Sequence, residues 1–316
     1  MAASPAAPAG GTTGLGSHTV SRIGFGAMQL ERLHDDRAAA VALLHRVAEL
    51  GVNHVDTAEF YGDGFVNSVI RDAYRDRLGA SDASDASADG TGMVIVSKVG
   101  ATPADGPIRL RLAQRPDELR ASVEDNLKSL GLDRIPVVNL RRTDTGPGLR
   151  AEGDQVVDLD DQLAVMTDLR DQGKIGAIGL SSVSIDTVRR ALPAGIVCVQ
   201  NAYSLVARRD EEILRLCVAE NIAWVPYFPL GGAFPGLPKV TDEPAVQAAA
   251  TALGATPAQV GLAWLLHHAP NTALIPGTAD PAHLEANIAA GALHFDAATL
   301  ATLDAVESRP LELPLS

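Results

Sequence analysis

Three residues that together can move a proton lie at the ends of apolar segments in this 316-residue chain. Asp56 ends the segment VNHVDTA, Tyr61 follows five residues later, and Lys98 lies near the end of MVIVSKV. A tyrosine with an ordinary pKa near 10 is a weak acid at neutral pH, and a nearby ammonium lowers that pKa. We expect Asp56 to keep Lys98 charged and oriented, and Lys98 to lower the pKa of Tyr61. Such a phenol can give a proton to a carbonyl oxygen as a hydride reaches the carbon.

Other catalytic chemistries lack a matching motif. The eight histidines include no HExxH, and Cys198 and Cys217 have no ligand spacing, so we expect no metal. No GxSxG occurs, which disfavours a serine hydrolase. No GxGxxG follows an apolar segment, which disfavours a Rossmann site. Taken alone, an Asp at position 56 is usually a helix N-cap or a turn former, so a catalytic role depends on what lies at the ends of the other strands.

Short apolar segments alternate with longer amphipathic ones. The apolar segments are continuous, which is typical of parallel strands buried on both faces. Because parallel strands need helical crossovers, eight such segments predict an α/β fold, a single-domain (β/α)8 TIM barrel, with an open doubly wound sheet as the alternative. The eight segments are 23–28, 52–58, 93–99, 136–141, 175–182, 196–203, 222–228 and 272–278.

Several predicted helices have readable ends. Asp35 and Asp36 are cap candidates for a helix that ends at Gly51, and the helix in RPDELRASVEDNLKSLG ends at Gly131. Thr256 is placed as the N-cap of another helix, with Pro257 at its first position.

The bulk composition limits partners and location. A net charge of −13 and a pI of about 5.0 disfavour nucleic-acid and anionic membrane surfaces as partners. No apolar run is long enough to span a membrane, and the first residues have no signal-peptide pattern. Two cysteines fit free buried thiols in a reducing cytoplasm. We expect a disordered tail over residues 1–18 and the barrel over 19–316; composition leaves open whether the protein is a monomer or a homo-oligomer.

Two insertions interrupt the alternation. The Ala/Ser/Asp-rich segment 79–92 predicts a mobile surface loop. The Gly/Pro-rich segment 142–155 follows the fourth strand, where a barrel carries its active-site loops. This segment is either a substrate-side loop or a passive insertion.

In a barrel, chemistry gathers where the strands end. The residues at these ends are Asp56, Lys98, Arg141, Ser181, Gln200, Asn201, Tyr227, Gly277 and Thr278. The motifs HVDTAEFYG, VIVSK, SVEDNLKSLGLD, GLSS, VQNAY, VPYFPLGG and LIPGTADPAHLEAN, in this order, resemble the aldo-keto reductase superfamily from about Ile23 to Asp304. The resemblance implies a barrel, an extended NADPH (NADP+) across its mouth, and a small aldehyde or ketone as substrate. It assigns Tyr61 as the acid, with Asp56 and Lys98 behind it.

The resemblance also implies cofactor-binding residues. Ser181 and Gln200 match residues that hydrogen-bond the nicotinamide carboxamide, and Tyr227 matches the ring that stacks on the nicotinamide. The other implied positions are Leu230 and Gly231 near the pyrophosphate, Gly277, Thr278, His283 and Asn287 near the 2′-phosphate and adenine, and Gly26, Met28, Asp56 and Phe228. Two positions depart from the family: Ser182 replaces the usual Asn, and His283 is weaker toward phosphate than the usual Arg or Lys.

Arg141 is the departure nearest the chemistry. Most family members end the fourth strand on a histidine, whereas a guanidinium only donates hydrogen bonds and stays charged. Our hypothesis is that Arg141 binds the carbonyl or phenolate oxygen of the substrate and lowers the pKa of Tyr61; the alternative is a salt bridge to Asp144 or another acid. The segments VVNLR, VPYFPLGG and IPGTxxxxHL are most similar to the branch containing pyridoxal reductases, which implies reduction of pyridoxal to pyridoxine.

Two further functions stay open. The chain could be a nucleotide-binding regulatory barrel subunit with vestigial reductase activity. It could also be a phosphate-binding barrel isomerase or lyase, although that function leaves Tyr61 and Gln200 unexplained.

Overall fold

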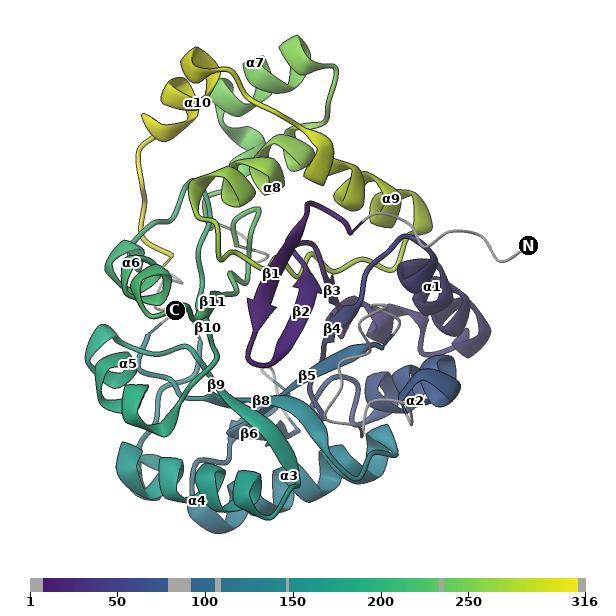
Figure 1. Cartoon of the computed structure of the whole chain (residues 1–316), viewed down its shortest axis with the longest axis vertical. Coiled ribbons are helices and arrows are strands. Elements are labelled where there is room, and N and C mark those ends of the chain that lie inside the picture. The colour runs from purple at the N-terminus through teal and green to yellow at the C-terminus, as the bar shows by residue number, and fades with distance from the viewer. Residues whose placement is uncertain (1–7, 79–91, 106–108, 146–147, 233–235, 312–316) are drawn as a thin grey trace.

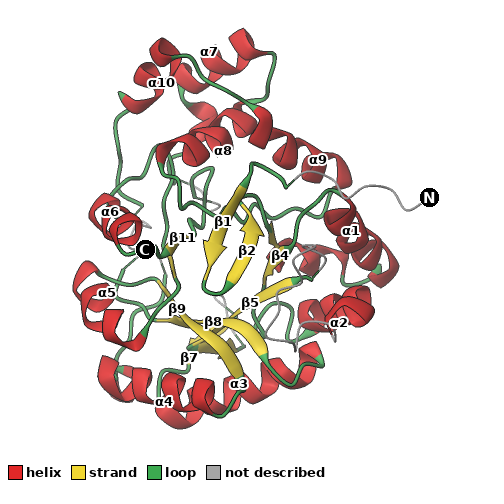
Figure 2. Cartoon of the chain, in the orientation of Figure 1, coloured by secondary structure: helices red, strands yellow, loops and turns green. Residues whose placement is uncertain are grey.

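The computed structural model describes residues 8–78, 92–105, 109–145, 148–232 and 236–311. Within them, parallel strands form an inner sheet that helices surround (Figures 1 and 2). In the order of their hydrogen bonding, the described strands of this sheet are β11 (Ala223–Trp224), β10 (Cys198–Gln200), β9 (Ile175–Ser181), β8 (Ile135–Arg141), β5 (Val94–Val99), β4 (His54–Asp56) and β3 (Phe25–Gly26).

The last apolar segment, 272–278, closes this sheet. On one side the Gly24 amide donates to Leu274 O at 2.8 Å, and on the other the Ala273 amide donates to Trp224 O at 2.9 Å. Both contacts are parallel bridges, to the β3 edge and to the β11 edge. The sheet is therefore a closed (β/α)8 barrel. This confirms the predicted TIM barrel and shows that the open-sheet alternative is wrong.

Helices form the outer layer and have the predicted ends. Asp36 accepts a hydrogen bond from the Ala39 amide, Gly131 has a φ of +66°, and Thr256 accepts from the Gln259 amide. The α-helices are α1 (Arg37–Glu49), α2 (Phe65–Leu78), α3 (Pro116–Leu130), α4 (Leu159–Asp171), α5 (Ile185–Ala191), α6 (Glu211–Ala219), α7 (Pro244–Leu253), α8 (Pro257–His268), α9 (Pro281–Ala289) and α10 (Ala297–Asp304). Short 3-10 helices are η1 (Ala27–Leu33), η2 (Gly153–Gln155), η3 (Leu192–Ala194), η4 (Val240–Asp242) and η5 (Ala290–Ala292).

The amino-terminal end of the barrel is covered by a hairpin of β1 (Thr12–Leu15) and β2 (His18–Ser21). Figure 1 looks down the barrel and shows this hairpin across its centre. Leu15 and Val20 pack inside the barrel against residues that include Val94 and Ala223, which begin β5 and β11. The predicted disordered tail over residues 1–18 is therefore wrong from Thr12 onward, because the hairpin buries apolar side chains; residues 1–7 lie outside the described part.

The remaining predictions about segments have mixed outcomes. Cys198 and Cys217 are buried free thiols, as expected. The prediction of a mobile loop over 79–92 falls almost wholly outside the described residues. A second antiparallel pair, β6 (Ala101–Pro103) with β7 (Leu110–Leu112), follows β5. In the described part of the chain no single helix is long and apolar enough to cross a membrane, although the sharply bent pair α7 and α8 passes by length and composition.

Candidate active site

Asp56 and Lys98 form a buried ion pair where β4 and β5 end. Lys98 Nζ donates to Asp56 Oδ1 and, at 2.9 Å, to Thr57 O. Only 3% of Asp56 and 6% of Lys98 is exposed. Burial of the ammonium lowers the pKa of Lys98, but the attraction of Asp56 and Tyr61 outweighs burial and leaves that pKa above its ordinary value. Lys98 is therefore a cation held in a dry environment.

Tyr61 lies in the loop between β4 and α2, and Lys98 Nζ is 5.0 Å from the centre of its ring. Burial of the phenol raises the pKa of Tyr61, and the positive charges of Lys98 and Arg141 offset this only in part. Lys98 lowers the pKa of Tyr61, as expected, but desolvation of the phenol is the larger effect, so this pKa stays above its ordinary value. The phenol is protonated at neutral pH, which is the form that a proton donor needs.

Gln200 supports the ion pair. Its Nε2 donates to Asp56 Oδ2 at 3.0 Å, and its Oε1 accepts from Asn139 Nδ2 at 3.4 Å. The side chain is fully buried. Its carboxamide thus contacts Asp56 and Asn139, whereas the family resemblance assigned it to the nicotinamide carboxamide. Ser181 lies beside Gln200 in the parallel ladder, also buried, at the end of β9.

Arg141 ends β8 and pairs with Ser181 across the ladder. Its Nη1 is buried and has no hydrogen-bond partner among the described residues. Burial lowers the pKa of Arg141, and the nearby Tyr227 and Tyr61 act against this effect. The alternative of a salt bridge to Asp144 is wrong, because Arg142 occupies that carboxylate, with Nε 3.1 Å from Oδ1.

Tyr227 forms a wall of the same rim beyond β11. Its hydroxyl lies 3.2 Å from Ser182 Oγ, and burial raises its pKa. Ser182 has a φ of +57° and Phe228 a φ of +54°, conformations that few residues other than glycine adopt. Strained backbone of this kind is enriched at binding sites, and here it occurs just beyond β9 and β11.

The glycines assigned to the cofactor also have roles within the fold. A Cβ on Gly231, which has a φ of +94°, would lie 2.2 Å from Pro238 O. A Cβ on Gly26 would lie 2.4 Å from Ile275 O, and one on Gly277 would lie 2.5 Å from Gly26 O. The absence of side chains at Gly26 and Gly277 thus lets the last segment close the barrel against β3.

The remaining assigned residues border the rim. Met28 in η1 is 40% exposed, Leu230 is partly buried, and the buried Thr278 accepts a hydrogen bond from the Asp280 amide at 3.0 Å. His283 and Asn287 are four residues apart on α9, so they share one face of that helix. Neither the imidazole nor the amide side chain has a hydrogen-bond partner within the described ranges.

Sequence reasoning missed three polar residues that shape this rim. Gln114 Nε2 donates to Gly100 O at 2.6 Å and to Arg141 O at 2.8 Å, and so ties the end of β5 to the end of β8. No sequence signal marks Gln114. Asn139 and His54 lie two residues before Arg141 and Asp56 on their strands, and this period-2 spacing predicts that they also face the barrel interior.

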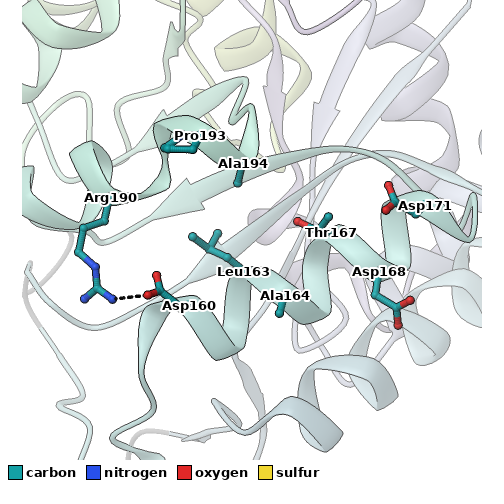
Figure 3. Close-up of a pocket in the computed structure, with 9 residues that line it drawn as sticks. All are labelled: Asp160, Leu163, Ala164, Thr167, Asp168, Asp171, Arg190, Pro193 and Ala194. Carbon is teal, nitrogen blue, oxygen red and sulfur yellow. Dashed lines mark ion pairs between the residues drawn. The ribbon is translucent and has the colours of Figure 1, made fainter.

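Two hollows among the described residues lie away from the ion pair. One, of about 660 Å³, lies outside the barrel between α4 and the α5–η3 segment, where Arg190 pairs with Asp160 at 3.1 Å (Figure 3). None of its lining residues ends a barrel strand, so we do not assign it to the chemistry. The other, of about 350 Å³, is lined by residues of the 142–155 segment together with Gln114, Val156 and Val157. That segment therefore borders a hollow next to the end of β8, although both interpretations of it stay open.

Among the described residues, no group of three or more His, Cys, Asp or Glu side chains could hold a metal ion. The site consists instead of a buried Asp–Lys pair under a protonated phenol, with a free guanidinium beside them. That arrangement can deliver a proton to an oxygen and stabilise the phenolate that remains.

Comparison with known proteins gives consistent matches. The model of the aldo/keto reductase family matches residues 22–308. Pyridoxine 4-dehydrogenase of Escherichia coli is 40% identical over 302 residues, which cover 92% of this chain and 96% of that protein. An uncharacterized oxidoreductase of Schizosaccharomyces pombe is 30% identical over 302 residues, covering 93% and 89%.

Two crystal structures of aldo-keto reductases have a similar fold. A thermostable one in complex with the inhibitor epalrestat has a TM-score of 0.74 and 25% identity, covering 93% of this chain and 99% of that one. One from Klebsiella pneumoniae in complex with NADP and acetate has a TM-score of 0.73 and 24% identity, covering 95% and 96%.

Proposed function

Because the chain belongs to the aldo/keto reductase family, we propose that it reduces aldehydes with NADPH, and that pyridoxal, which gives pyridoxine, is one of them. The chain is an NAD(P)-dependent oxidoreductase. We propose the direction of the reaction, the preference for NADPH, the aldehyde substrate and the catalytic and cofactor-binding residues as follows.

The contact of Lys98 with both Asp56 and Tyr61 carries the proposed chemistry. Tyr61 gives its proton to the carbonyl oxygen of the substrate. The phenolate that results is stabilised by the Lys98 ammonium, which lies 5.0 Å from the ring centre. Asp56 holds Lys98 in place by accepting its hydrogen bond, and Gln200 in turn holds Asp56 by donating to its other carboxylate oxygen. Because the pair is buried, its charges act in a low dielectric, where they are stronger than in water.

The rim is compatible with a dinucleotide. The strained Ser182 and Phe228 backbones frame the Tyr227 ring, which is only partly buried and presents an aromatic face for a nicotinamide. On one face of α9, His283 and Asn287 have side chains without a hydrogen-bond partner among the described residues, so we propose both for the adenosine end. When bound, NADPH supplies the hydride. We assign Ser181 and Tyr227 to the nicotinamide, Leu230 and Gly231 to the pyrophosphate, and Thr278, His283 and Asn287 to the adenosine part.

Two of the cofactor-binding residues implied by the family resemblance, Gln200 and His283, need a separate assignment. Gln200 is engaged by Asp56 and Asn139, so we assign it to the ion pair and not to the nicotinamide. His283 is the residue assigned to the proposed 2′-phosphate, and a histidine is a weaker phosphate partner than the Arg or Lys that the family usually has there. We therefore propose a moderate preference for NADPH over NADH.

The substrate is proposed from similarity. The relative of 40% identity is named for the oxidation of pyridoxine, the reverse of pyridoxal reduction. The test is the oxidation of NADPH and NADH by the purified protein with pyridoxal, benzaldehyde and propanal. We expect turnover with NADPH and the highest kcat/KM with pyridoxal. Turnover of the other aldehydes but not of pyridoxal would reject the substrate. Tight NADPH binding without any turnover would favour the regulatory-subunit alternative.

A further inference from the structure

The Arg141 side chain is aimed into the mouth of the barrel. Side chains two residues apart on a strand face the same side, and Asn139 faces the interior, where it contacts Gln200. The backbone of Arg141 is fixed by Gln114, which donates to its carbonyl at 2.8 Å. A Cβ on Gly100 would lie 2.3 Å from the same carbonyl, so the two strand ends are packed closely. The guanidinium thus extends from a rigid base.

No acid of the described chain neutralises this guanidinium. Asp144 is occupied by Arg142 and by Thr187, whose hydroxyl is 2.6 Å from Oδ2. Asp56 is occupied by Lys98 and Gln200. Throughout the described ranges, no carboxylate lies within ion-pair distance of Arg141.

A buried charged donor without a partner is destabilising, so proteins seldom keep one without a ligand for it. Nη1 of Arg141 is such a donor. Arginine does not lose its proton in proteins, so the group stays a cation that favours an anionic oxygen. Tyr61 and Tyr227 are near enough to act on the pKa of Arg141, so the cation lies near both the proposed proton donor and the proposed nicotinamide wall.

We propose that Arg141 receives an anionic oxygen that the substrate carries next to its reacting carbonyl, and that the preferred substrates are ortho-hydroxy aromatic aldehydes in their phenolate form. This inference rests on the proposed aldehyde reduction. A guanidinium presents two parallel N–H groups, which match two oxygens side by side, as in such an aldehyde. Tyr61 and Tyr227 lie near this guanidinium, and aromatic side chains favour contact with a planar aromatic substrate. Pyridoxal belongs to this class, because its hydroxyl is adjacent to its aldehyde.

The test compares aldehydes that differ only in the position of one hydroxyl. The kcat/KM with NADPH is measured for 2-hydroxybenzaldehyde, 4-hydroxybenzaldehyde and benzaldehyde, for the wild type and for Arg141→Met and Arg141→Lys. A hydrogen bond to a charged group corresponds to roughly a tenfold to hundredfold effect, so the wild type should prefer the ortho isomer over the para isomer by that factor. Arg141→Met should reduce the preference to about threefold or less, mainly through KM, and Arg141→Lys should retain part of it.

Two controls accompany this test: one asks whether the substrate must ionise, and the other asks whether Arg141 is needed for folding. 2-Methoxybenzaldehyde cannot ionise, so its kcat/KM should not rise with pH as the ortho phenol of 2-hydroxybenzaldehyde ionises. Arg141→Met removes an unsatisfied buried charge, so it should melt at the wild-type temperature or above and bind NADPH as the wild type does. A purely structural Arg141 would instead give a variant of lower melting temperature with its isomer preference intact.

Other outcomes overturn the inference in distinguishable ways. Equal use of the two isomers by the wild type, or an ortho preference that survives Arg141→Met, rejects the role of Arg141 while leaving aldehyde reduction in place. Phenylglyoxylate, which carries a carboxylate next to its carbonyl, is assayed in the same way. If the wild type prefers it through Arg141 and shows no ortho preference, the anionic group that Arg141 binds is a carboxylate and the phenolate proposal is rejected. No turnover of any of these aldehydes rejects the proposed function together with this inference.

Discussion

Replacing Lys98 by methionine should destabilise the protein strongly. The variant keeps most of the side-chain volume but removes the hydrogen bonds to Asp56 Oδ1 and Thr57 O. Asp56, only 3% exposed, is then left as a buried carboxylate whose remaining donor is Gln200. Removing one partner of a buried ion pair costs about 3–5 kcal/mol, and we expect this loss in the free energy of unfolding at pH 7.

The measurement is chemical unfolding of the variant and of the wild type at pH 7, followed by fluorescence and circular dichroism.

The matched control is Lys174→Met, which breaks the exposed pair of Lys174 with Glu124 and should cost less than about 1 kcal/mol. The double variant Asp56→Asn with Lys98→Met should recover much of the loss, because no charge stays buried. A loss below about 1 kcal/mol for Lys98→Met, or a double variant no more stable than the single one, would refute this reasoning.

Three other predictions follow from the geometry of the site and of its supports. Gly100 has a φ of +104°, and a Cβ there would lie 2.3 Å from the carbonyl that ends β8, so Gly100→Ala should lower the free energy of unfolding by about 2–4 kcal/mol in urea titrations. The control is Gly14→Ala, whose Cβ would meet nothing within 4 Å and which should change this free energy by less than about 1 kcal/mol. The hydrogen bond from His268 lowers the pKa of Glu211 to about 2, below its ordinary 4.5, so the ionised carboxylate stabilises the fold above pH 4.5 and this stabilisation is lost as the pH falls toward 2. Glu211→Gln should therefore lower the free energy of unfolding by about 1–2 kcal/mol at pH 6, after discounting for solvent screening, and by nearly nothing at pH 2. Gln200→Leu removes the hydrogen bond to Asp56, so it should lower kcat roughly tenfold to hundredfold while the affinity for NADPH stays within about threefold of wild type. An equally large loss of NADPH affinity would instead indicate that the Gln200 side chain binds the nicotinamide.

Much of the barrel could be predicted because its signals are local. The continuous apolar segments, the cap at Asp36 and the glycine at Gly131 predict strands and helices that the structure contains. The amino-terminal hairpin was missed because TTGL and HTVS are short, and only their packing against distant strand residues stabilises them. The last segment was predicted as a regular strand, whereas it closes the barrel through isolated bridges.

The candidate site was predictable in composition but not in its balance of forces. The order of motifs identified Asp56, Tyr61 and Lys98, and the structure brings them together. Sequence could not weigh the desolvation of Tyr61 against the charge of Lys98, because burial depends on the complete fold. Nor could the sequence indicate that the carboxamide of Gln200 donates a hydrogen bond to Asp56, since these residues are 144 positions apart.

Tyr61→Phe tests the proposed proton transfer most directly, because it removes one oxygen and keeps the ring. The measurement is single-turnover oxidation of bound NADPH by saturating pyridoxal or benzaldehyde, together with the NADPH dissociation constant. We predict that the rate falls by about 10²–10⁴ while the dissociation constant stays within about threefold of wild type. A rate within tenfold of wild type would contradict the assignment of Tyr61 as the proton donor.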